Sequence, residues 1–381
     1  MLFLGIMMPF VNLPAQRNAY RNQLEKAEKA VLDSGCYIGG DQVRLLEQEL
    51  DSYCGAAHAV TCGSGTQAIE IALSVLGLEP GDQVIVPDFT FIAPAECVQK
   101  LGGIPVFADI DPRTLQIDPE SVEKLVGPKT KGIIAVNLFG QCAPYKKLRE
   151  IANRHGLWIL EDSAQAFGAT CTAGDSSSEG KACRACTFGD ISITSFYPTK
   201  PLGCYGDGGA IFTANPEYAE KARLLANHGS KERYRHIEIG TNGRLDALQA
   251  AVLRVKLQHL DQELEQRQQN AKVYDQFFAG LPGFTPQAIA AGNTSTYAQY
   301  TLMVENRAEF TSRLEKAGIP YCIHYPLPLH EQPCFKKLAA NDGAGFAGNA
   351  TTEKVCGQVI SLPFCAFTDV QSVVEKISKT F

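Results

Sequence analysis

The chain has 381 residues, of which 45% are hydrophobic and 20% charged, and its formal net charge at pH 7 is -6. This length suits two or three domains with buried cores, and the composition excludes a disordered or fibrous protein. The acidic balance argues against nucleic acid and anionic membrane surfaces as partners. We therefore expect a globular protein without a membrane partner.

The start of the chain is apolar, but it lacks the basic region and the cleavage site of a signal peptide. The initiator is Met1, Met7 or Met8. The 13 cysteines are scattered without the dense spacing of a disulfide scaffold, which favours the cytoplasm. The one close pair, Cys183 and Cys186, lacks the further ligands of a closed zinc site. We expect no metal, with a redox or metal role for this pair as the minor alternative.

Helical spacing of apolar residues predicts a helix over 15–32, ended by Gly35, and a second helix after 37–40. From there to residue 213, short apolar runs alternate with further helices. The strands are expected at 59–61, 83–86, 104–107, 132–136, 158–160, 191–195 and 210–213. The helices are expected at 68–75, 93–101, 119–125 and 145–155. This alternation predicts an α/β fold with a largely parallel sheet covered by helices on both faces.

The segment 172–185 is small and polar, and it predicts a surface loop or hairpin. A helix at 216–227 follows, and the longest periodic run, 245–278, predicts one long helix or two helices joined by a bend. Beyond it we expect a strand at 297–304, a helix at 307–317, a proline-rich loop at 324–330 and a last helix after Asp369. The predicted domains are 1–248, which is large and has a helical N-terminal segment, and 249–381, which is smaller and is entered through the long helix.

Four separated features could carry chemistry. The first is the turn 63–66 between a strand and a helix, where free N–H groups and the helix dipole favour a phosphate. It has neither the G-x-G-x-x-G nor the P-loop pattern, so a simple helix cap is the alternative. The second is Asp162, at the carboxyl end of a hydrophobic strand, where ligands of α/β sheets gather. Its carboxylate suits either a cationic ring nitrogen or a helix cap.

The third feature is Phe91, which follows the strand 83–86 and suits either a stacking platform for a flat cofactor or the core. The fourth is Lys200, held between Pro198 and Pro201 on a stiff turn. A primary amine in a dry pocket has a lowered pKa and can form a Schiff base, whereas an ordinary surface lysine is the alternative. A binding site for pyridoxal 5'-phosphate (PLP) needs all four features: a turn that binds the phosphate, a platform for the ring, a carboxylate and a lysine.

Over nearly its whole length the chain resembles the nucleotide-sugar aminotransferases of the DegT/DnrJ/StrS type, which are fold-type-I PLP enzymes. The resemblance rests on YIGG at 37–40, SGT at 64–66, VPDFTF at 86–91, EDSAQ at 161–165, SFYPTK at 195–200, GDGG at 206–209 and GTNGRL at 240–245. It implies a large domain with a mostly parallel seven-stranded sheet between helices, and a smaller α+β C-terminal domain. One departure is the segment 168–190, which is longer and richer in cysteine than is usual in the family.

The resemblance also implies roles for individual residues. Lys200 is expected to be the Schiff-base lysine and proton shuttle, Asp162 the partner of the pyridinium nitrogen, and Gln165 a contact to the ring hydroxyl. The phosphate is expected to bind Gly65, Thr66 and Ser195, and the ring to stack on Phe91. Asn242 is expected to reach the cofactor phosphate of the neighbouring subunit. The resemblance thus implies a homodimer with shared active sites.

The sequences at 198–213, 297–300 and 324–330 look most like the branch of the family that aminates the 3-keto group of a UDP-2-acetamido-2-deoxy-hexuronic acid. This resemblance implies L-glutamate as the amino donor. It also implies a role in the synthesis of lipopolysaccharide O-antigen or a related cell-surface glycan. The candidate substrate contacts are Arg233, Arg235, His236, His324 and His330. A dTDP- or UDP-linked 3- or 4-keto-6-deoxy sugar is the alternative substrate. A non-enzymatic PLP-binding regulator is a further alternative, which the complete set of Lys200, Asp162 and Gln165 argues against.

Overall fold

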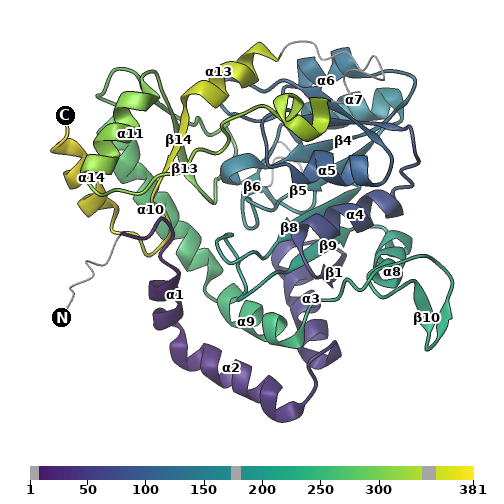
Figure 1. The fold of residues 1–381 in the computed structure, drawn as a ribbon. Helices are drawn as coiled ribbons and strands as arrows, with labels where there is room; N and C mark the ends of the chain where they lie inside the picture. Colours follow the sequence, from purple (N-terminus) through teal and green to yellow (C-terminus); the bar gives the residue numbers. More distant parts are fainter. Residues whose placement is uncertain (1–7, 173–181, 337–348) are drawn as a thin grey trace.

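A computed structural model describes residues 8–172, 182–336 and 349–381 of the chain (Figure 1). The prediction about the initiator and most of the predicted loop at 172–185 lie outside these residues. The short strands that flank this loop, β6 (Thr170–Cys171) and β7 (Cys183–Arg184), pair antiparallel, as a hairpin requires.

A seven-stranded sheet with the order β1-β9-β8-β5-β4-β2-β3 forms the centre of the larger part. Its strands are β1 (His58–Cys62), β2 (Gln83–Pro87), β3 (Ile104–Ala108), β4 (Thr130–Val136), β5 (Trp158–Asp162), β8 (Ile191–Ser195) and β9 (Gly209–Thr213). All neighbours are parallel except for β9, which is antiparallel to both β1 and β8. The predicted α/β class, the mostly parallel sheet and all seven predicted strands are confirmed.

Helices cover both faces of this sheet (Figure 1). They are α4 (Gly65–Val75), α5 (Ala93–Lys100), α6 (Pro119–Leu125), α7 (Tyr145–His155) and α8 (Pro216–Leu225). Successive strand residues point to opposite faces, so Ile134 packs in one core cluster, with α4, α5 and α8, while Ile133 packs in another, with α6 and α7. The sheet is thus buried on both sides, which explains why its strands are almost uniformly apolar.

The N-terminal region differs from the prediction. The expected helix at 15–32 is two helices, α1 (Leu13–Ala19) and α2 (Arg21–Ser34), followed by α3 (Gly40–Cys54). The break falls at Tyr20, whose ring stacks on His259 with 4.1 Å between centroids. This contact with a distant part of the chain competes with helical continuity and cannot be seen in local periodicity.

The long periodic run forms two helices, α9 (Ala247–Leu257) and α10 (Leu260–Phe278), so the bent alternative is confirmed. A small antiparallel sheet follows, made of β12 (Phe284–Pro286), β13 (Tyr300–Val304) and β14 (Val359–Leu362). The helices of this region are α10, α11 (Arg307–Lys316), α13 (Ala350–Gln358) and α14 (Val370–Ser378). The predicted strand at 297–304 begins only at Tyr300 because Tyr297 has a left-handed backbone, with φ of 44°.

Two short helical turns and one hairpin complete the described elements. They are η1 (Leu138–Gly140), η2 (Leu329–Glu331) and the antiparallel pair β10 (Ser230–Glu232) and β11 (Arg235–His236). The β10–β11 hairpin projects from the lower right in Figure 1. Residues of the C-terminal region, among them Leu329 and Val355, pack in the same core cluster as Ile134 of the large sheet. The domain boundary at 248 stays a prediction. Within the described residues, no helix has both the length and the apolarity that a membrane span requires.

Helix α3 contains a carboxylate whose ionisation opposes folding. Asp51 has an oxygen that is buried and finds no hydrogen-bond partner among the described residues. Burial raises the pKa of Asp51 to about 6, from an ordinary value of 3.8, although His58 and Arg223 oppose this shift. The folded state therefore binds a proton more tightly than the unfolded state, and stability is lost as the pH rises from about 4 to about 6.

We expect Asp51→Asn to raise the free energy of unfolding by about 1 kcal/mol at pH 8 and to change it little at pH 4, since only the charged form is penalised. Urea unfolding at the two pH values measures this difference. Asp41→Asn, at an exposed position of the same helix, is the matched control and should not gain stability at pH 8. A variant of Asp51 with equal effects at both pH values would contradict the prediction.

Candidate active site

A cavity of about 530 Å³ lies at the carboxyl ends of β4, β5 and β8 and at the N-terminus of α4. This is the edge of an α/β sheet where ligands are expected. Seven of the eight residues expected from the sequence to bind the cofactor line it: Gly65, Thr66, Phe91, Asp162, Gln165, Ser195 and Lys200. The topology thus brings together residues from four separated segments.

The start of α4 forms a cradle of backbone N–H groups. The Ser64 hydroxyl accepts a hydrogen bond from the Gln67 amide (3.1 Å) and caps the helix, so the first-turn amides of Gly65 and Thr66 have no partner within it. A Cβ at position 65 would lie 2.6 Å from the Cβ of Ser195, so only glycine allows this close approach. The arrangement fits a phosphate, because the amides, the helix dipole and the Ser195 hydroxyl meet there.

Lys200 and Asp162 are oppositely charged residues that both line the cavity. Burial lowers the pKa of Lys200, and the Asp162 carboxylate opposes this shift. Burial likewise raises the pKa of Asp162, whereas a hydrogen bond from the Ala164 amide (2.9 Å) and the charge of Lys200 oppose it. A lysine that loses its proton easily is a better nucleophile, and a buried carboxylate fits a cationic ring nitrogen. The residues present therefore fit PLP.

Gln165 and Phe91 are placed for contact with a flat ring. The Gln165 side-chain oxygen accepts a hydrogen bond from the Phe139 amide (2.7 Å), which leaves its NH₂ group to donate toward the cavity, where the Tyr325 hydroxyl lies 3.4 Å away. Phe91 is 53% exposed, so it is not a core residue, and its ring lies 6.3 Å from that of Tyr325. One face of the phenyl ring can therefore serve as a platform.

The turn that carries Lys200 is supported from α9. The buried Lys256 donates a hydrogen bond from Nζ to the carbonyl of Gly203 (2.7 Å), and burial lowers the pKa of Lys256 to about 8. A Cβ at position 203 would lie 2.4 Å from the Pro198 carbonyl oxygen. The turn is consequently packed against its own backbone, with no room for a side chain at position 203.

The structure assigns a structural role to Glu161, which sequence reasoning left without one. Its buried carboxylate accepts five hydrogen bonds of 2.7–2.9 Å, from the Asn137 amide, the Ser163 and Ser192 hydroxyls, and the backbone N–H groups of Cys186 and Phe188. Alternation along β5 points Glu161 away from the face that Asp162 uses. Two successive acidic residues at the end of an apolar strand were the available signal.

The substrate candidates divide between the cavity and other places. His324 lines the cavity, and its Nδ1 lies 3.0 Å from the Ser361 hydroxyl. Burial, with a further contribution from Lys200, lowers the pKa of His324 to about 4. At this pKa the imidazole is uncharged at neutral pH, so it is suited to hydrogen bonding and not to binding as a cation.

The remaining substrate candidates do not line this cavity. Arg233, Arg235 and His236 are exposed on the β10–β11 hairpin. His330 binds Asp88 instead, with 2.5 Å between Nδ1 and the carboxylate. Asn242 is also outside the cavity of its own chain and accepts a hydrogen bond from Arg244 (2.6 Å). Its predicted contact concerns a neighbouring subunit and stays a prediction.

Sequence reasoning missed several cavity residues, namely Tyr197, Thr199, Asp207, Gln299 and Tyr325. Tyr325 contacts Phe89 and Phe91 with its ring and Gln165 with its hydroxyl. It lies beside His324 in a loop noted for its histidines, and a tyrosine carries no signal of its own there. Among the described residues, no group of three or more His, Cys, Asp or Glu side chains could hold a metal ion.

A lysine opposite a carboxylate, beside a phosphate cradle at the strand ends of an α/β sheet, defines the class of PLP-dependent transferases. Residues 18–378 match the model of the DegT/DnrJ/EryC1/StrS aminotransferase family, and the chain belongs to this family. The family assignment confirms the predicted enzyme class and cofactor. The protein is a PLP-dependent sugar aminotransferase.

Three relatives illustrate the match. The chain is 42% identical over 367 residues, covering 96% of this chain and 98% of the relative, to the UDP-2-acetamido-2-deoxy-3-oxo-D-glucuronate aminotransferase of Pseudomonas aeruginosa. It is 40% identical over 93% of its length and 90% of the relative to the dTDP-3-amino-3,4,6-trideoxy-alpha-D-glucose transaminase of Streptomyces venezuelae. The crystal structure of NtdA from Bacillus subtilis with bound cofactor PMP superposes with a TM-score of 0.86 at 30% identity, covering 100% of this chain and 86% of that one.

We expect Glu161→Gln to lower the free energy of unfolding by about 2–4 kcal/mol, because the amide loses the negative charge and turns a donor toward groups that also donate. Urea unfolding measures the change. Glu123→Gln is the matched control, since Glu123 pairs with Arg154 and His155 on the surface, where the loss of an ion pair changes stability little. Equal unfolding midpoints for the two variants would show that the five donors do not depend on the Glu161 charge.

Proposed function

We propose that the enzyme transfers the amino group of L-glutamate to the 3-keto group of a UDP-2-acetamido-2-deoxy-hexuronic acid in the cytoplasm, for O-antigen or another cell-surface glycan. The observation that supports this choice of substrate is the 42% identity to the Pseudomonas aeruginosa aminotransferase over nearly the full length of both chains. The complete lysine, carboxylate and glutamine set in one cavity supports the chemistry.

PLP, when bound, supplies an aldehyde that carries the amino group and a ring that withdraws electrons. Gly65, Thr66 and Ser195 would hold its phosphate, and Phe91 would cover one face of the ring. Asp162 would keep the ring nitrogen protonated, because a buried carboxylate gains a charged partner there. Gln165 would donate a hydrogen bond to the ring hydroxyl through the NH₂ group that Phe139 leaves available.

Lys200 does the proton transfer in both half-reactions. Its lowered pKa lets the amine act as a base at neutral pH, so it can remove the α-proton of L-glutamate. In the second half-reaction the same ammonium group delivers a proton to C3 of the sugar. The donor and the acceptor thus occupy one cavity in turn, and the packed turn around Lys200 keeps the amine at a constant position for both.

We propose that the active enzyme is a homodimer with shared active sites. The described residues that line the cavity include no arginine, although a nucleotide diphosphate and a sugar carboxylate require cations. Arg233, Arg235 and His236 lie on the exposed hairpin, and Asn242 follows closely. The proposal is that these residues reach the cavity of a second copy and complete its phosphate and substrate contacts.

A dTDP- or UDP-linked 3- or 4-keto-6-deoxy sugar is the second candidate acceptor. The 40% identity to the Streptomyces venezuelae transaminase favours it. A non-enzymatic regulator has less support, because every residue expected to bind the cofactor in the cavity is present.

Lys200→Ala should still bind pyridoxamine phosphate but lose turnover by about 1000-fold or more, since no other group replaces the base and nucleophile. Steady-state assays and the absorption spectrum of the purified protein measure these two properties. Lys124→Ala, on α6, is the control for loss of a lysine elsewhere. Turnover within tenfold of wild type would remove Lys200 from the mechanism.

A panel of UDP- and dTDP-linked keto sugars, assayed with L-glutamate, tests the substrate. The UDP-3-keto-hexuronate is expected to give a kcat/KM at least about tenfold above that of any 6-deoxy sugar, because contacts to its carboxylate add transition-state binding. The reverse order would support the second candidate. Failure of L-glutamate to change the cofactor absorption would contradict the proposed donor.

A further inference from the structure

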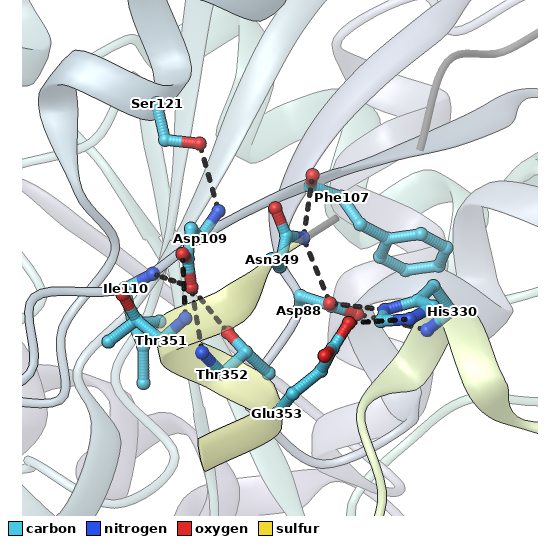
Figure 2. A network of polar contacts seen from close by, with 10 residues as sticks. All are labelled: Asp88, Phe107, Asp109, Ile110, Ser121, His330, Asn349, Thr351, Thr352 and Glu353. Carbon is cyan, nitrogen blue, oxygen red and sulfur yellow. Dashed lines mark hydrogen bonds and ion pairs between the residues drawn. The ribbon is translucent and has the colours of Figure 1, made fainter. Parts of the chain in front are cut away.

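Asp88 joins the large sheet to the C-terminal region through its carboxylate (Figure 2). It follows directly after β2 and its side chain is completely buried. One carboxylate oxygen accepts a hydrogen bond from the backbone N–H of His330 (2.9 Å), and the other accepts from His330 Nδ1 (2.5 Å) and Asn349 Nδ2 (2.9 Å). The Asp88 carbonyl also accepts from the Leu329 amide (2.9 Å).

This contact specifies the orientation of His330. A carboxylate only accepts hydrogen bonds, so Nδ1 must carry a proton and donate it. The other ring nitrogen, Nε2, lies 3.9 Å from a carboxylate oxygen of Glu353, whose side chain is half exposed. His330 is bound by Asp88 at both its backbone and its ring, so the segment around it cannot shift along β2 without losing two hydrogen bonds to a buried charge.

Both sides of this contact continue into the walls of the active-site cavity. Thr90 and Phe91 follow Asp88 and line the cavity, and His324 and Tyr325 precede His330 and line it from the other side. The two walls touch, since the Tyr325 ring lies 6.1 Å from that of Phe89 and 6.3 Å from that of Phe91. The buried pair is therefore the polar contact that joins the chain segments behind these walls.

We propose that Asp88 and His330 are positioning residues that set the distance between the Phe91 wall and the His324–Tyr325 wall, and thereby admit the sugar acceptor to Lys200. The expected cofactor contacts at 65–66, 162, 165 and 195 lie on other segments. Phe91 is the exception, but it is carried by the segment directly after β2 of the large sheet, so loss of the pair is expected to displace the His324–Tyr325 wall and to leave Phe91 in place. The inference rests on the proposed function in one respect, namely that the nucleotide-sugar acceptor is larger than the amino donor. A misplaced wall then impairs the acceptor half-reaction more than the donor half-reaction.

The neighbouring strand supplies a matched comparison. Asp109, just after β3, accepts hydrogen bonds from the backbone N–H groups of Thr351 and Thr352 (3.1 and 2.9 Å) and from the Thr352 hydroxyl (2.8 Å) (Figure 2). It thus also fastens the C-terminal region to the large sheet. Its partners belong to α13, however, which contributes no lining residue to the cavity. A purely structural role would make Asp88 and Asp109 equivalent.

The experiment compares Asp88→Asn, His330→Leu and His330→Asn with the controls Asp109→Asn and Glu353→Gln, all as PLP-loaded full-length enzymes. The donor half-reaction is followed by the loss of the cofactor band with L-glutamate. The acceptor is the sugar that wild type uses best in the panel of UDP- and dTDP-linked keto sugars. If wild type uses none of them, the proposed function has failed before any variant is judged.

For Asp88→Asn and His330→Leu we expect an unchanged cofactor band, a donor half-reaction within about threefold of wild type, and a kcat/KM for the sugar lowered about 10- to 100-fold. His330→Asn should recover much of the loss, because its amide places a donor near the position of Nδ1. Asp109→Asn and Glu353→Gln should stay within about threefold in both half-reactions, even where thermal unfolding shows a loss of stability.

Two outcomes would overturn the proposal. Equal losses in the donor and acceptor half-reactions would mean that the pair only stabilises the fold. A loss of sugar kcat/KM no larger than that of Asp109→Asn would mean that the cavity wall does not depend on it. If Asp88→Asn does not fold, the His330 variants decide the question alone, because His330 is partly exposed and His330→Asn keeps a donor near the buried Asp88 carboxylate.

Discussion

Five donors converge on the buried carboxylate of Glu161, and the active site depends on this interaction. The donors come from the end of β4, from the segment after β5, from the segment before β8 and from β8 itself. A buried charge is tolerated only when it is fully hydrogen-bonded, so these segments must occupy one arrangement. Asp162 is the next residue, and its position opposite Lys200 follows from that arrangement. A carboxylate that does not line the cavity thus helps to fix the position of one that does.

Carboxylates that accept hydrogen bonds from other segments also follow two other strands of the sheet. Asp88 after β2 and Asp109 after β3 are acceptors for the C-terminal region, as Glu161 is for the centre of the sheet. Parallel strands leave their carboxyl ends together at one edge, where backbone N–H groups of later segments arrive. Carboxylates at this edge therefore serve two purposes, since some order the chain and one, Asp162, faces the cavity. Sequence position alone does not distinguish these purposes.

Most of the large sheet and the cofactor side of the cavity could be predicted from the sequence, because both depend on local patterns. Apolar runs of strand length, the glycine turn before α4 and the prolines around Lys200 are visible over a few residues. The break at Tyr20 was missed because the contact that accompanies it, the stacking of the Tyr20 ring on His259, comes from a distant part of the chain. Helix α13 and strand β14 were missed because the helix passes directly into the strand at Val359, with no loop between them.

The C-terminal wall of the cavity could not be predicted from local sequence patterns, for a related reason. His330 is a plausible substrate contact in the sequence, yet its partner Asp88 is 242 residues away and buried. The sequence around Tyr325 gives no sign that it lines a cavity. Its place becomes clear only from its contacts with Phe89, Phe91 and Gln165. The cofactor contacts lie in short motifs that can be recognised from a few neighbouring residues. The wall, in contrast, is formed by packing between residues far apart in the chain. Its identity therefore emerges only from the fold.

The antiparallel direction of β9 has a consequence for the motion of the catalytic amine. Because β9 returns beside β8, the segment with Lys200 begins and ends on one ladder, where Ser195 pairs with Gly209 and the Phe196 amide binds the Gly208 carbonyl (2.7 Å). A loop whose ends are already held together loses little further chain entropy when it becomes ordered. While this ladder is closed, motion of Lys200 is confined to the short segment between Phe196 and Gly208, and only opening of the central sheet would release the whole segment.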